Sequence, residues 1–257
     1  MKIDQLAAIL NLLNVPKIDP QKVRNLVSKF NIPESIFSLT EQELCGVEGI
    51  DQKSAKAIRS FNDFDIGKKL AGKTISYGIT IYTLWDKEYP QLLKKIYDPP
   101  VLLYSIGRPL NAKEDTVAIV GTRSATQYGK RVTMKLATEL SSKNIVIVSG
   151  LARGIDTIAH TATVQNKQRT IAVLGNGLDI IYPSENRKLF ENILEKGTIV
   201  SEFPIGTKPE ASNFPKRNRI ISGLCHATVV VEAGNKSGAI LTALNAVDQN
   251  RETFAVP

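Results

Sequence analysis

The sequence is poor in histidine and cysteine, with only two residues of each among its 257. Cys45 and Cys225 are too few for the disulfide framework of a small secreted protein, and they suit a reducing compartment. Four such side chains also make a zinc site improbable, because zinc is usually held by several Cys or His ligands. We therefore expect no structural disulfides and no metal.

Long apolar runs are missing as well. The N-terminal run MKIDQLAAILNLLNV resembles the start of a signal peptide, but Asp4 and Asn11 interrupt its apolar residues and no small-residue cleavage site follows. No segment approaches the roughly 18 apolar residues of a membrane span. The sequence therefore predicts a cytoplasmic protein that does not associate with membranes.

The glycine signatures of common nucleotide-binding enzymes are also absent. A dinucleotide site needs G-x-G-x-x-G between the first strand and its helix, and the corresponding turn has only Gly121 and Gly129. The run GTRSATQYGKR is not a P-loop, because seven residues separate its glycines and Arg131 stands where Ser or Thr is needed. We expect no cofactor and no ATP hydrolysis.

Catalytic constellations are equally sparse. Asp156 and His160 are four residues apart on one face of an expected helix, a spacing that is more often structural than catalytic. Cys225 and His226 are adjacent, so their side chains would point to opposite faces of a strand, and we expect Cys225 to be packed in the core. Asp179 is expected to cap or orient a loop. These residues predict a binding protein and not an enzyme.

The charge that is present is mostly positive. Lys and Arg number 33 against 25 Asp and Glu, which gives a formal net charge of +8. Residues 1–70 hold ten cations and nine anions, so nearly all of the excess lies in residues 71–257. Such an excess favours a polyanionic partner, and a solvated basic surface is the alternative.

Residues 1–70 have the pattern of a small helical domain. DQLAAILNLLN carries apolar residues at helical spacing, and DPQKVRNLVSKF places Asp19 as a cap before Pro20 at a first helical position. LCGVEGIDQKSAKAIRSF resembles a helix-hairpin-helix motif, in which a glycine turn presents backbone N–H groups to a phosphate. Because the segment is nearly neutral, a packing module without a DNA contact is slightly favoured.

Residues 71–257 have the pattern of an α/β domain. GITIYTLWDKEYP and PPVLLYSIG predict strands around a short helix in YPQLLKKIYDPP. Further strands are predicted in VAIVG, IVIVSG, TIAVLG, TIVSE, ATVVVEA and TFAVP, and amphipathic helical segments separate most of them. Continuous apolar strands that alternate with helices indicate a doubly wound, mostly parallel sheet.

The runs that follow these strands are chemically unusual. They are GTRSATQYGKR, SGLARGID, GNGLDIIYPSEN, SEFPIGTKPEASNFPKRNR and EAGNKSG, and four of the five combine glycines with small hydroxyl groups and cations. Open α/β sheets bind ligands at this edge. Glycines let an anion approach the backbone, and Arg binds its oxygens in a fork. We therefore predict an anion site beyond the strand ends.

The run NFPKRNRIISG, residues 213–223, is expected to be a basic loop at that edge. Lys216, Arg217 and Arg219 supply cations and Phe214 supplies an aromatic face, while Tyr128 and Tyr182 lie in other loops of the same edge. Aromatic stacking in a basic groove holds single-stranded nucleic acid without reading its sequence. The polymer that these residues favour is therefore a single strand.

A structural role is the alternative for these arginines. Glu202 and Glu232 stand at the ends of two expected strands, where they could pair with Arg217 and Arg219 and stiffen the loops. A general-base role for either glutamate is less favoured. The two hypotheses differ in whether the guanidinium groups are left available to a ligand.

The helical segment SGAILTALNAVDQN presents two apolar surfaces. Ile240, Ala243, Leu244 and Val247 fall on one face, which we expect to pack on the sheet. Leu241 points elsewhere. Together with the last strand, TFAVP, it could extend the sheet or join a partner, because a terminal strand leaves one side unpaired.

Six runs, in this order, closely resemble the DNA-processing protein A family, also called Smf: VAIVGTRSATQYG, SGLARGIDTIAH, TIAVLGNGLDIIYPSEN, SEFPIGTKP, FPKRNRIISGL and EAGNKSGAILTA. The resemblance extends from about Tyr89 to Pro257. It implies a sterile-alpha-motif-like helical domain at residues 1–70 and an extended Rossmann-like DNA-binding domain at residues 71–257. Many members of the family carry a winged-helix-like domain after the part that corresponds to these residues, and the functions of that domain are not assigned to this sequence.

The resemblance also implies a function. Members of the family bind single-stranded DNA, protect it during natural transformation and help to load the RecA recombinase onto it. On the same basis we expect a homodimer with RecA as its partner. The DNA-binding residues implied by motif match, with Phe214 ahead of the R-N-R tripeptide and Arg153 on the same edge, are Arg123, Arg153, Phe214, Lys216, Arg217, Arg219, Lys236, Ser237 and Gly238.

A nucleotide-processing enzyme of the same Rossmann type is the alternative function. Phosphoribohydrolases of this type carry P-G-G-x-G-T-x-x-E with a catalytic Glu, whereas EAGNKSGAILTA has no Glu after its glycines. A nucleotide sensor is a third hypothesis. Titration of a fluorescent oligonucleotide against mononucleotides would distinguish the three.

Overall fold

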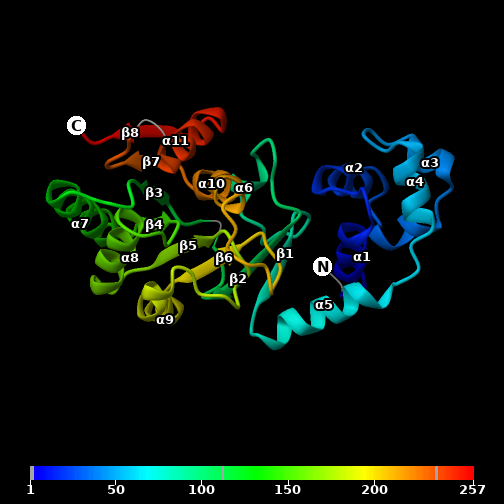
Figure 1. Cartoon of the computed structure of the whole chain (residues 1–257), viewed down its shortest axis with the longest axis horizontal. Helices are drawn as coiled ribbons and strands as arrows, with labels where there is room; N and C mark the ends of the chain where they lie inside the picture. The colour runs from blue at the N-terminus through cyan, green and yellow to red at the C-terminus, as the bar shows by residue number, and fades with distance from the viewer. Residues whose placement is uncertain (1–2, 112, 235–236) are drawn as a thin grey trace. The chain divides into compact units, whose positions relative to one another are not determined.

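The computed structural model describes residues 3–111, 113–234 and 237–257, and these form two compact units that divide after Gly78 (Figure 1). The sequence placed this boundary after residue 70. It lies later because helix α5 (Asp65–Ser76) packs on α1 (Ile3–Asn14). The amide of Gly67 donates to Oδ1 of Asn11 at 2.8 Å, so α5 belongs to the first unit.

The first unit is helical, and polar caps begin several of its helices. Beside α1 and α5 it contains α2 (Pro20–Phe30), η1 (Pro33–Ser38), α3 (Glu41–Cys45) and α4 (Gln52–Arg59). Asp19 caps α2 by accepting the Lys22 amide at 2.9 Å, as its place before Pro20 predicts. The glycine turn of the predicted helix-hairpin-helix joins α3 to α4, and Gly49 has the positive φ of +80° that favours glycine there.

The second unit is built on one eight-stranded sheet with the order β1-β2-β6-β5-β4-β3-β7-β8. The pairs from β6 through β8 are parallel, whereas β1 and β2 are antiparallel to their neighbours. This confirms the predicted mostly parallel sheet. The strands are β1 (Thr80–Thr83), β2 (Leu102–Gly107), β3 (Thr116–Val120), β4 (Val146–Ser149), β5 (Thr170–Leu174), β6 (Thr198–Ser201), β7 (Ala227–Val230) and β8 (Glu252–Ala255).

Helices cover both faces of this sheet, which confirms the doubly wound fold (Figure 1). One face carries α7 (Gln127–Ser142), α8 (Ile155–Gln165) and α9 (Arg187–Lys196), which follows the short η2 (Ser184–Asn186). The other carries α10 (Asn213–Gly223) and α11 (Gly238–Asp248), with the short α6 (Gln91–Lys94) beside α10. None of the helices in the described part of the chain is long and apolar enough to cross a membrane.

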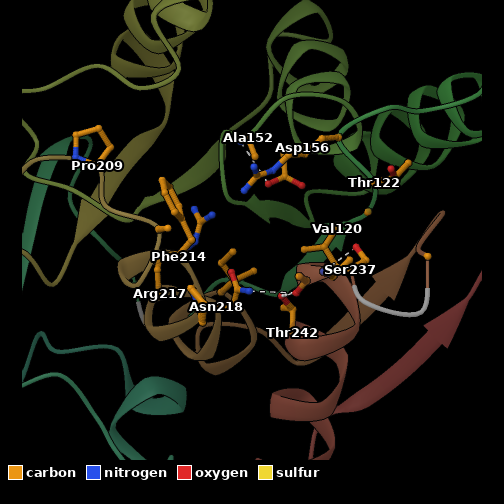
Figure 2. Close-up of a pocket in the computed structure, with 18 of the residues that line it drawn as sticks. Val120, Thr122, Ala152, Asp156, Pro209, Phe214, Arg217, Asn218, Ser237 and Thr242 are labelled. Atoms are coloured by element: carbon orange, nitrogen blue, oxygen red, sulfur yellow. Dashed lines mark hydrogen bonds between the residues drawn. The ribbon is translucent and has the colours of Figure 1, made fainter.

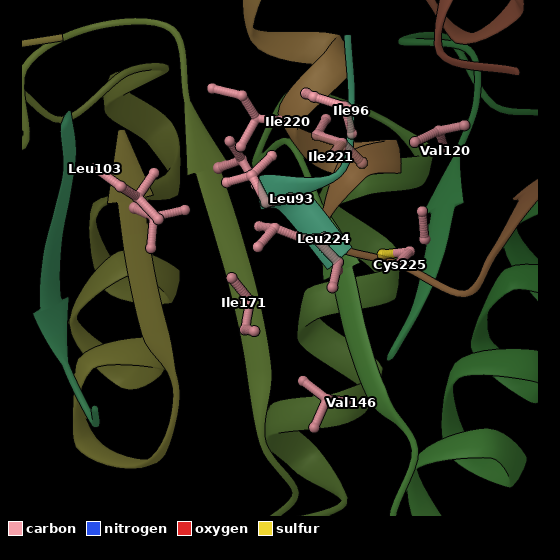
Figure 3. Packing of buried hydrophobic residues seen from close by; sticks show 14 of the residues in the cluster. Leu93, Ile96, Leu103, Val120, Val146, Ile171, Ile220, Ile221, Leu224 and Cys225 are labelled. Atoms are coloured by element: carbon pink, nitrogen blue, oxygen red, sulfur yellow. The ribbon is translucent and has the colours of Figure 1, made fainter. Parts of the chain in front are cut away.

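Alternating strand residues supply the two halves of the core. Ala118 and Val120 of β3 belong to the cluster under α6 and α10, whereas Ile119 between them packs with α7 and α8. Figure 3 shows the first of these clusters, in which Leu93 and Ile96 from the α6 segment meet residues of α10. The α10 contribution is Ile220, Ile221 and Leu224 just after it.

The segment 213–223, expected to be a basic loop, is the helix α10. Pro215 stands in its first turn, where the helix does not need a backbone N–H, so the proline does not prevent the helix. Ile220 and Ile221 are buried and hold the second half of α10 on the sheet. Because a helix turns by about 100° per residue, the neighbouring cations point in different directions.

The prediction for the apolar face of α11 was also wrong. Leu244 and Val247 are 55% and 58% exposed, and Ile240 and Ala243 are only half-buried. The helix packs through small side chains, which allow it to lie close to α10, namely Ala239, Thr242 and Ala246. Leu241, expected to point away, is 45% exposed, so α11 presents an apolar stripe of Leu241, Leu244 and Val247 to solvent.

Candidate nucleic-acid interface

The carboxyl ends of the parallel strands surround a pocket of about 860 Å³ (Figure 2). This is the edge at which the sequence predicted an anion site. The lining comes from the turns after β3, β4 and β5, the loop before α10, and the first turns of α10 and α11. It includes Thr122, Arg123, Ala152, Asp156, Tyr182, Pro209, Phe214, Arg217, Asn218, Ser237, Gly238 and Thr242.

Arg217 forms part of the pocket wall although its side chain is almost completely buried, with 4% exposed. Its Nη1 donates to the carbonyl oxygen of Gly150 at 2.6 Å and also to that of Val173. An added Cβ at Gly150 would come within 2.6 Å of the guanidinium carbon, so a side chain there would require Arg217 to move. Nε of Arg217 is buried and has no partner within the described part of the chain. Burial lowers the pKa of Arg217 to about 10, and it remains a cation at neutral pH.

Asp156 lies behind this arginine. Its Oδ2 accepts the backbone N–H groups of Gly150 and Ala152, at 3.1 and 3.4 Å. Burial raises the pKa of Asp156, and the positive charge of Arg217 opposes that rise. The two side chains therefore interact electrostatically in the pocket wall, and the hydrogen bonds of Asp156 fix the turn after β4.

Phe214 supplies an aromatic face flanked by cations. The guanidinium carbons of Arg123 and Arg217 lie 5.9 and 6.0 Å from the centre of its ring, which is cation–π distance. The ring of Tyr182 is 5.7 Å away and tilted by 37°. Gly175 lies under the Phe214 ring, where an added Cβ would come within 3.0 Å of it. An aromatic surface of this kind can stack a base.

The turn after β3 is held firmly although Arg123 itself is exposed. The Thr122 amide donates to the Glu232 carbonyl at 2.7 Å, and the Ile155 amide donates to the Thr122 carbonyl at 3.1 Å. Gly154 has a φ of +77° and passes so close to the Thr122 carbonyl that no side chain would fit. Arg123 therefore projects from a rigid turn beside the pocket.

The first turn of α11 provides backbone donors on the opposite wall. Ser237 caps the helix by accepting the Ala239 amide at 3.2 Å, and Gly238 is exposed. Asn218 of α10 donates to the Gly238 carbonyl at 3.1 Å (Figure 2). A helix N-terminus carries partial positive charge and favours anions. Lys236, also predicted to bind DNA, lies outside the described residues.

Arg219 does not line the pocket. It pairs with Glu202 at 2.6 Å and with Asp98 at 3.1 Å, and only 18% of its side chain is exposed. The structural alternative therefore holds for Arg219 with Glu202. It does not hold for Glu232, which accepts hydrogen bonds from the amide and hydroxyl groups of Thr126.

Two other predicted cations are exposed beyond the pocket. Arg153 forms an ion pair with Glu185 and is not part of the pocket lining that the structure describes. The hydrogen bond to Glu185 raises the pKa of Arg153 and lowers that of Glu185. Lys216 is exposed on α10. Of the predicted residues, the pocket brings together Arg123, Phe214, Arg217, Ser237 and Gly238.

Sequence reasoning missed several polar residues of the pocket. Asn218 was hidden because its segment was taken for a loop, in which neighbouring residues have no fixed direction. Thr242 lies one helical turn beyond Gly238, a spacing that could have placed it on the same wall. Asp156 was noticed only as a partner for His160, but its carboxylate instead accepts the amides of the turn after β4.

Cys225 and His160 are buried away from solvent. Cys225 is completely buried, as expected, and burial raises the pKa of its thiol strongly, which makes it a poor nucleophile. His160 is also completely buried, and burial lowers its pKa to about 3. Over the described ranges, no group of three or more His, Cys, Asp or Glu side chains is arranged to hold a metal ion.

Two family models match the chain. The model of DNA recombination-mediator protein A matches residues 80–257, and a SAM-like helix-hairpin-helix tandem matches residues 9–61. The first match covers the α/β unit, including every described pocket residue. The second covers the glycine turn between α3 and α4, which confirms the helix-hairpin-helix prediction.

Curated relatives match over most of the chain. It is 42% identical over 252 residues to Protein Smf of Synechocystis sp., which covers 95% of this chain and 62% of that protein. It is 46% identical over 181 residues to DNA processing protein DprA of Bacillus subtilis, which covers 70% of this chain and 61% of that protein. The chain thus spans about three fifths of the length of these relatives.

Solved structures are similar as well. DNA processing protein A from Streptococcus pneumoniae superimposes with a TM-score of 0.83 at 31% identity, over 100% of this chain and 87% of that one. A structure that describes the unique single-stranded DNA binding mode of DNA processing protein A from Helicobacter pylori gives a TM-score of 0.63 at 33% identity. That match covers 70% of this chain and 80% of the other.

Proposed function

This chain belongs to the DNA recombination-mediator protein A family, and we propose that it binds single-stranded DNA in the pocket at the carboxyl edge of its sheet. The observation that carries this proposal is the combination of Phe214 with the guanidinium groups of Arg123 and Arg217 in one pocket. A base can stack on the ring, and phosphate oxygens can bind the cations beside it.

The positive charge of Arg217 supports an anionic ligand in this pocket. Its guanidinium belongs to the pocket wall and remains a cation at neutral pH. The N-terminus of α11 favours negative charge on the opposite wall. Both features suit one nucleotide of a strand at the centre of the pocket.

A polymer is favoured over a free nucleotide by the cations outside the pocket. Lys216 and Arg153 are exposed around it, where they can contact neighbouring phosphates of the same strand. The Helicobacter pylori relative is described by its single-stranded DNA binding mode, which supports the same class of ligand here.

Binding without catalysis is part of the proposal. Asp156 is the acidic side chain of the described pocket lining, and two backbone amides and the charge of Arg217 hold it in place. His160 is buried beneath the sheet edge and neutral. We therefore expect neither nucleotide hydrolysis nor ATP hydrolysis.

We further propose that the protein is a homodimer that protects DNA during natural transformation and transfers it to the RecA recombinase. Family membership supports this proposal. The exposed stripe of Leu241, Leu244 and Val247 on α11 supports the dimer, because an apolar surface of this kind is characteristic of an interface. Two joined pockets would raise the effective concentration of the second contact on one strand.

Fluorescence anisotropy tests the DNA proposal. A labelled oligonucleotide is titrated with the protein, and unlabelled single strand, duplex and mononucleotides then compete. We expect single strand to compete best, with a logarithmic salt slope of about −0.7 for each phosphate neutralised. Preference for duplex, competition by mononucleotides at equal concentration, or an affinity independent of salt would contradict the proposal.

A further inference from the structure

Tyr97 has the most exposed large apolar or aromatic side chain in the described part of the chain, with 97% of its surface accessible. It follows α6 in the second unit, two residues before the buried Pro99. An aromatic ring gains no packing energy when it is fully exposed. Its position is therefore not explained by the stability of the fold.

The segment that carries Tyr97 is fixed on both sides of the ring. Ile96 is buried in the core cluster under α10 (Figure 3). After Tyr97, Asp98 is bound to Arg219 at 3.1 Å, and the carbonyl oxygen of Pro100 accepts the hydroxyl of Tyr89 at 2.8 Å. The backbone thus holds an exposed ring at a defined place, which lowers the entropy that a ligand loses on binding it.

This place adjoins the DNA pocket. Arg219, which holds Asp98, is on α10 two residues after Arg217 of the pocket wall. The same guanidinium binds Glu202, directly after β6 at the carboxyl edge of the sheet. Tyr97 therefore lies at the edge that carries the pocket, on the β6 side, because its neighbour Asp98 and Glu202 bind the same guanidinium.

The charges around Tyr97 favour a polyanion. Lys94 and Lys95 precede it and are exposed, and Lys216 is exposed on the neighbouring helix. No carboxylate among the residues the structure describes is within ion-pair distance of these three lysines. The acidic side chains of Asp98 and Glu202 both pair with Arg219.

We propose that Tyr97 is a second base-stacking platform, which binds the same single strand outside the pocket while Lys94, Lys95 and Lys216 bind its phosphates. This inference rests on the proposed function of the pocket. A protein partner is less favoured, because the exposed residues that precede the ring, Lys94 and Lys95, are charged, whereas a protein interface has an apolar centre.

Oligonucleotides of two lengths test the inference. The wild-type protein and Tyr97→Ala are titrated with a strand of about four nucleotides, which fills the pocket, and with one of about sixteen. We expect the substitution to lower the affinity for the long strand on the order of tenfold and to leave the affinity for the short strand unchanged. Tyr97→Phe keeps the ring, so it should bind both strands like the wild type.

Tyr77→Ala is the matched control, because Tyr77 is a half-exposed tyrosine of the first unit. Thermal unfolding should be the same for all variants. Equal affinities of Tyr97→Ala and wild type for the long strand would overturn the platform while the proposed function stands. An equal loss of affinity for both strands would overturn the platform too, because the substitution would then be acting on binding in the pocket. A wild-type protein that binds neither strand would refute the proposed function itself, and the platform with it.

Discussion

Arg219 and Glu202 form a two-pronged ion pair, in which Nη2 donates to Oε2 at 2.6 Å and Nη1 donates to Oε1 at 3.1 Å. The two side chains are only 18% and 16% exposed. Nε of Arg219 adds a hydrogen bond to Asp98 at 3.1 Å. One guanidinium thus connects α10 to the end of β6 and to the segment that follows α6.

Replacement of Arg219 with alanine should therefore act on stability first. It leaves the mostly buried Glu202 carboxylate without its partner, which should cost on the order of 3 kcal/mol of unfolding free energy. Chemical denaturation monitored by circular dichroism measures this. Lys216→Ala, an exposed cation one turn away, is the control and should change stability by about 0.5 kcal/mol or less. Normal stability of Arg219→Ala with lost DNA binding would show instead that Arg219 contacts DNA directly.

Arg123→Ala should instead weaken DNA binding and leave the stability of the fold unchanged. The side chain is exposed beside Phe214 on a turn that the backbone holds, so the fold does not depend on it. We expect DNA binding to weaken by about 1–3 kcal/mol and the salt slope to fall by about 0.7, with unfolding unchanged. Lys143→Ala, at the far end of α7, is the control and should bind normally. An unchanged salt slope in Arg123→Ala would mean that this arginine neutralises no phosphate.

Replacement of Arg217 should not affect DNA binding and stability independently of each other. Its side chain both lines the pocket and holds the Gly150 carbonyl, so Arg217→Ala is expected to lose stability and DNA binding together. Loss of binding in this variant alone would therefore say little about contact with DNA, and Arg123 is the more informative position.

His160 should make the protein sensitive to acid. Its Nδ1 lies 2.7 Å from Thr170 Oγ1, whose hydroxyl donates to the Ile147 carbonyl, so Nδ1 carries the proton of a neutral ring. The pKa of His160 is about 3 in the folded protein and 6.5 in the unfolded chain, so the unfolded chain takes up the proton first as the pH falls. The contribution of the neutral His160 to the free energy of unfolding is therefore fully present above pH 6.5. It falls as the pH drops below 6.5, by about 2 kcal/mol at pH 5.

Urea titrations at pH 7 and pH 5 measure this loss in the wild type and in His160→Gln. The variant, which has no group that titrates at this position, should show a smaller difference between the two pH values. Asp156 acts in the opposite direction, because its raised pKa stabilises the fold on protonation, and it is present in both proteins. Equal differences in the two proteins would contradict the assignment to His160.

Leu244→Asp should shift the protein toward monomers if the α11 stripe is the dimer interface. Leu244 is 55% exposed, so a carboxylate there costs little in the isolated chain but would be buried in a dimer. Light scattering over a concentration series measures the mass. Met134→Asp on α7, 47% exposed, is the matched control and should leave the mass unchanged. An unchanged mass for Leu244→Asp at the lowest concentration would place the interface elsewhere.

The sheet could be predicted from the sequence because its strands are short continuous apolar runs separated by helical patterns. VAIVG and IVIVSG, for example, became β3 and β4, with alternate residues in the two halves of the core. The rule that ligands bind at the carboxyl edge then indicated where the pocket would be. Both predictions depend on the periodicity of apolar residues along the sequence, which is independent of how individual side chains pack.

The nature of α10 and of its arginines could not be predicted in the same way. The run from Asn213 to Arg219 has no apolar periodicity, and its three cations suggested a basic loop. Nothing in the sequence distinguishes Arg217, whose charge is buried against backbone carbonyls, from the exposed Lys216 beside it. These differences come from the direction of each side chain on the helix, which is set by packing.

The same limit explains the error at α11. Leu244 and Val247 fall on the same helical face as Ile240 and Ala243, so this apolar stripe was expected to pack on the sheet. The short distance between α10 and α11 instead requires Ala239, Thr242 and Ala246 at their contact, and this distance is a property of the whole unit.

The strand order also has a consequence for synthesis on the ribosome. β2 pairs with β6 and β3 pairs with β7, and in both cases the partner is made roughly a hundred residues later. Until then, a nascent chain has an open edge on each of these strands, and pairings so distant in sequence form slowly. The helices of the first unit can pack before the rest of the chain is synthesised, because their contact partners lie within residues 1–78. We expect ribosome-bound chains that stop before β6 to have a protease-resistant first unit and a second unit that is still digested.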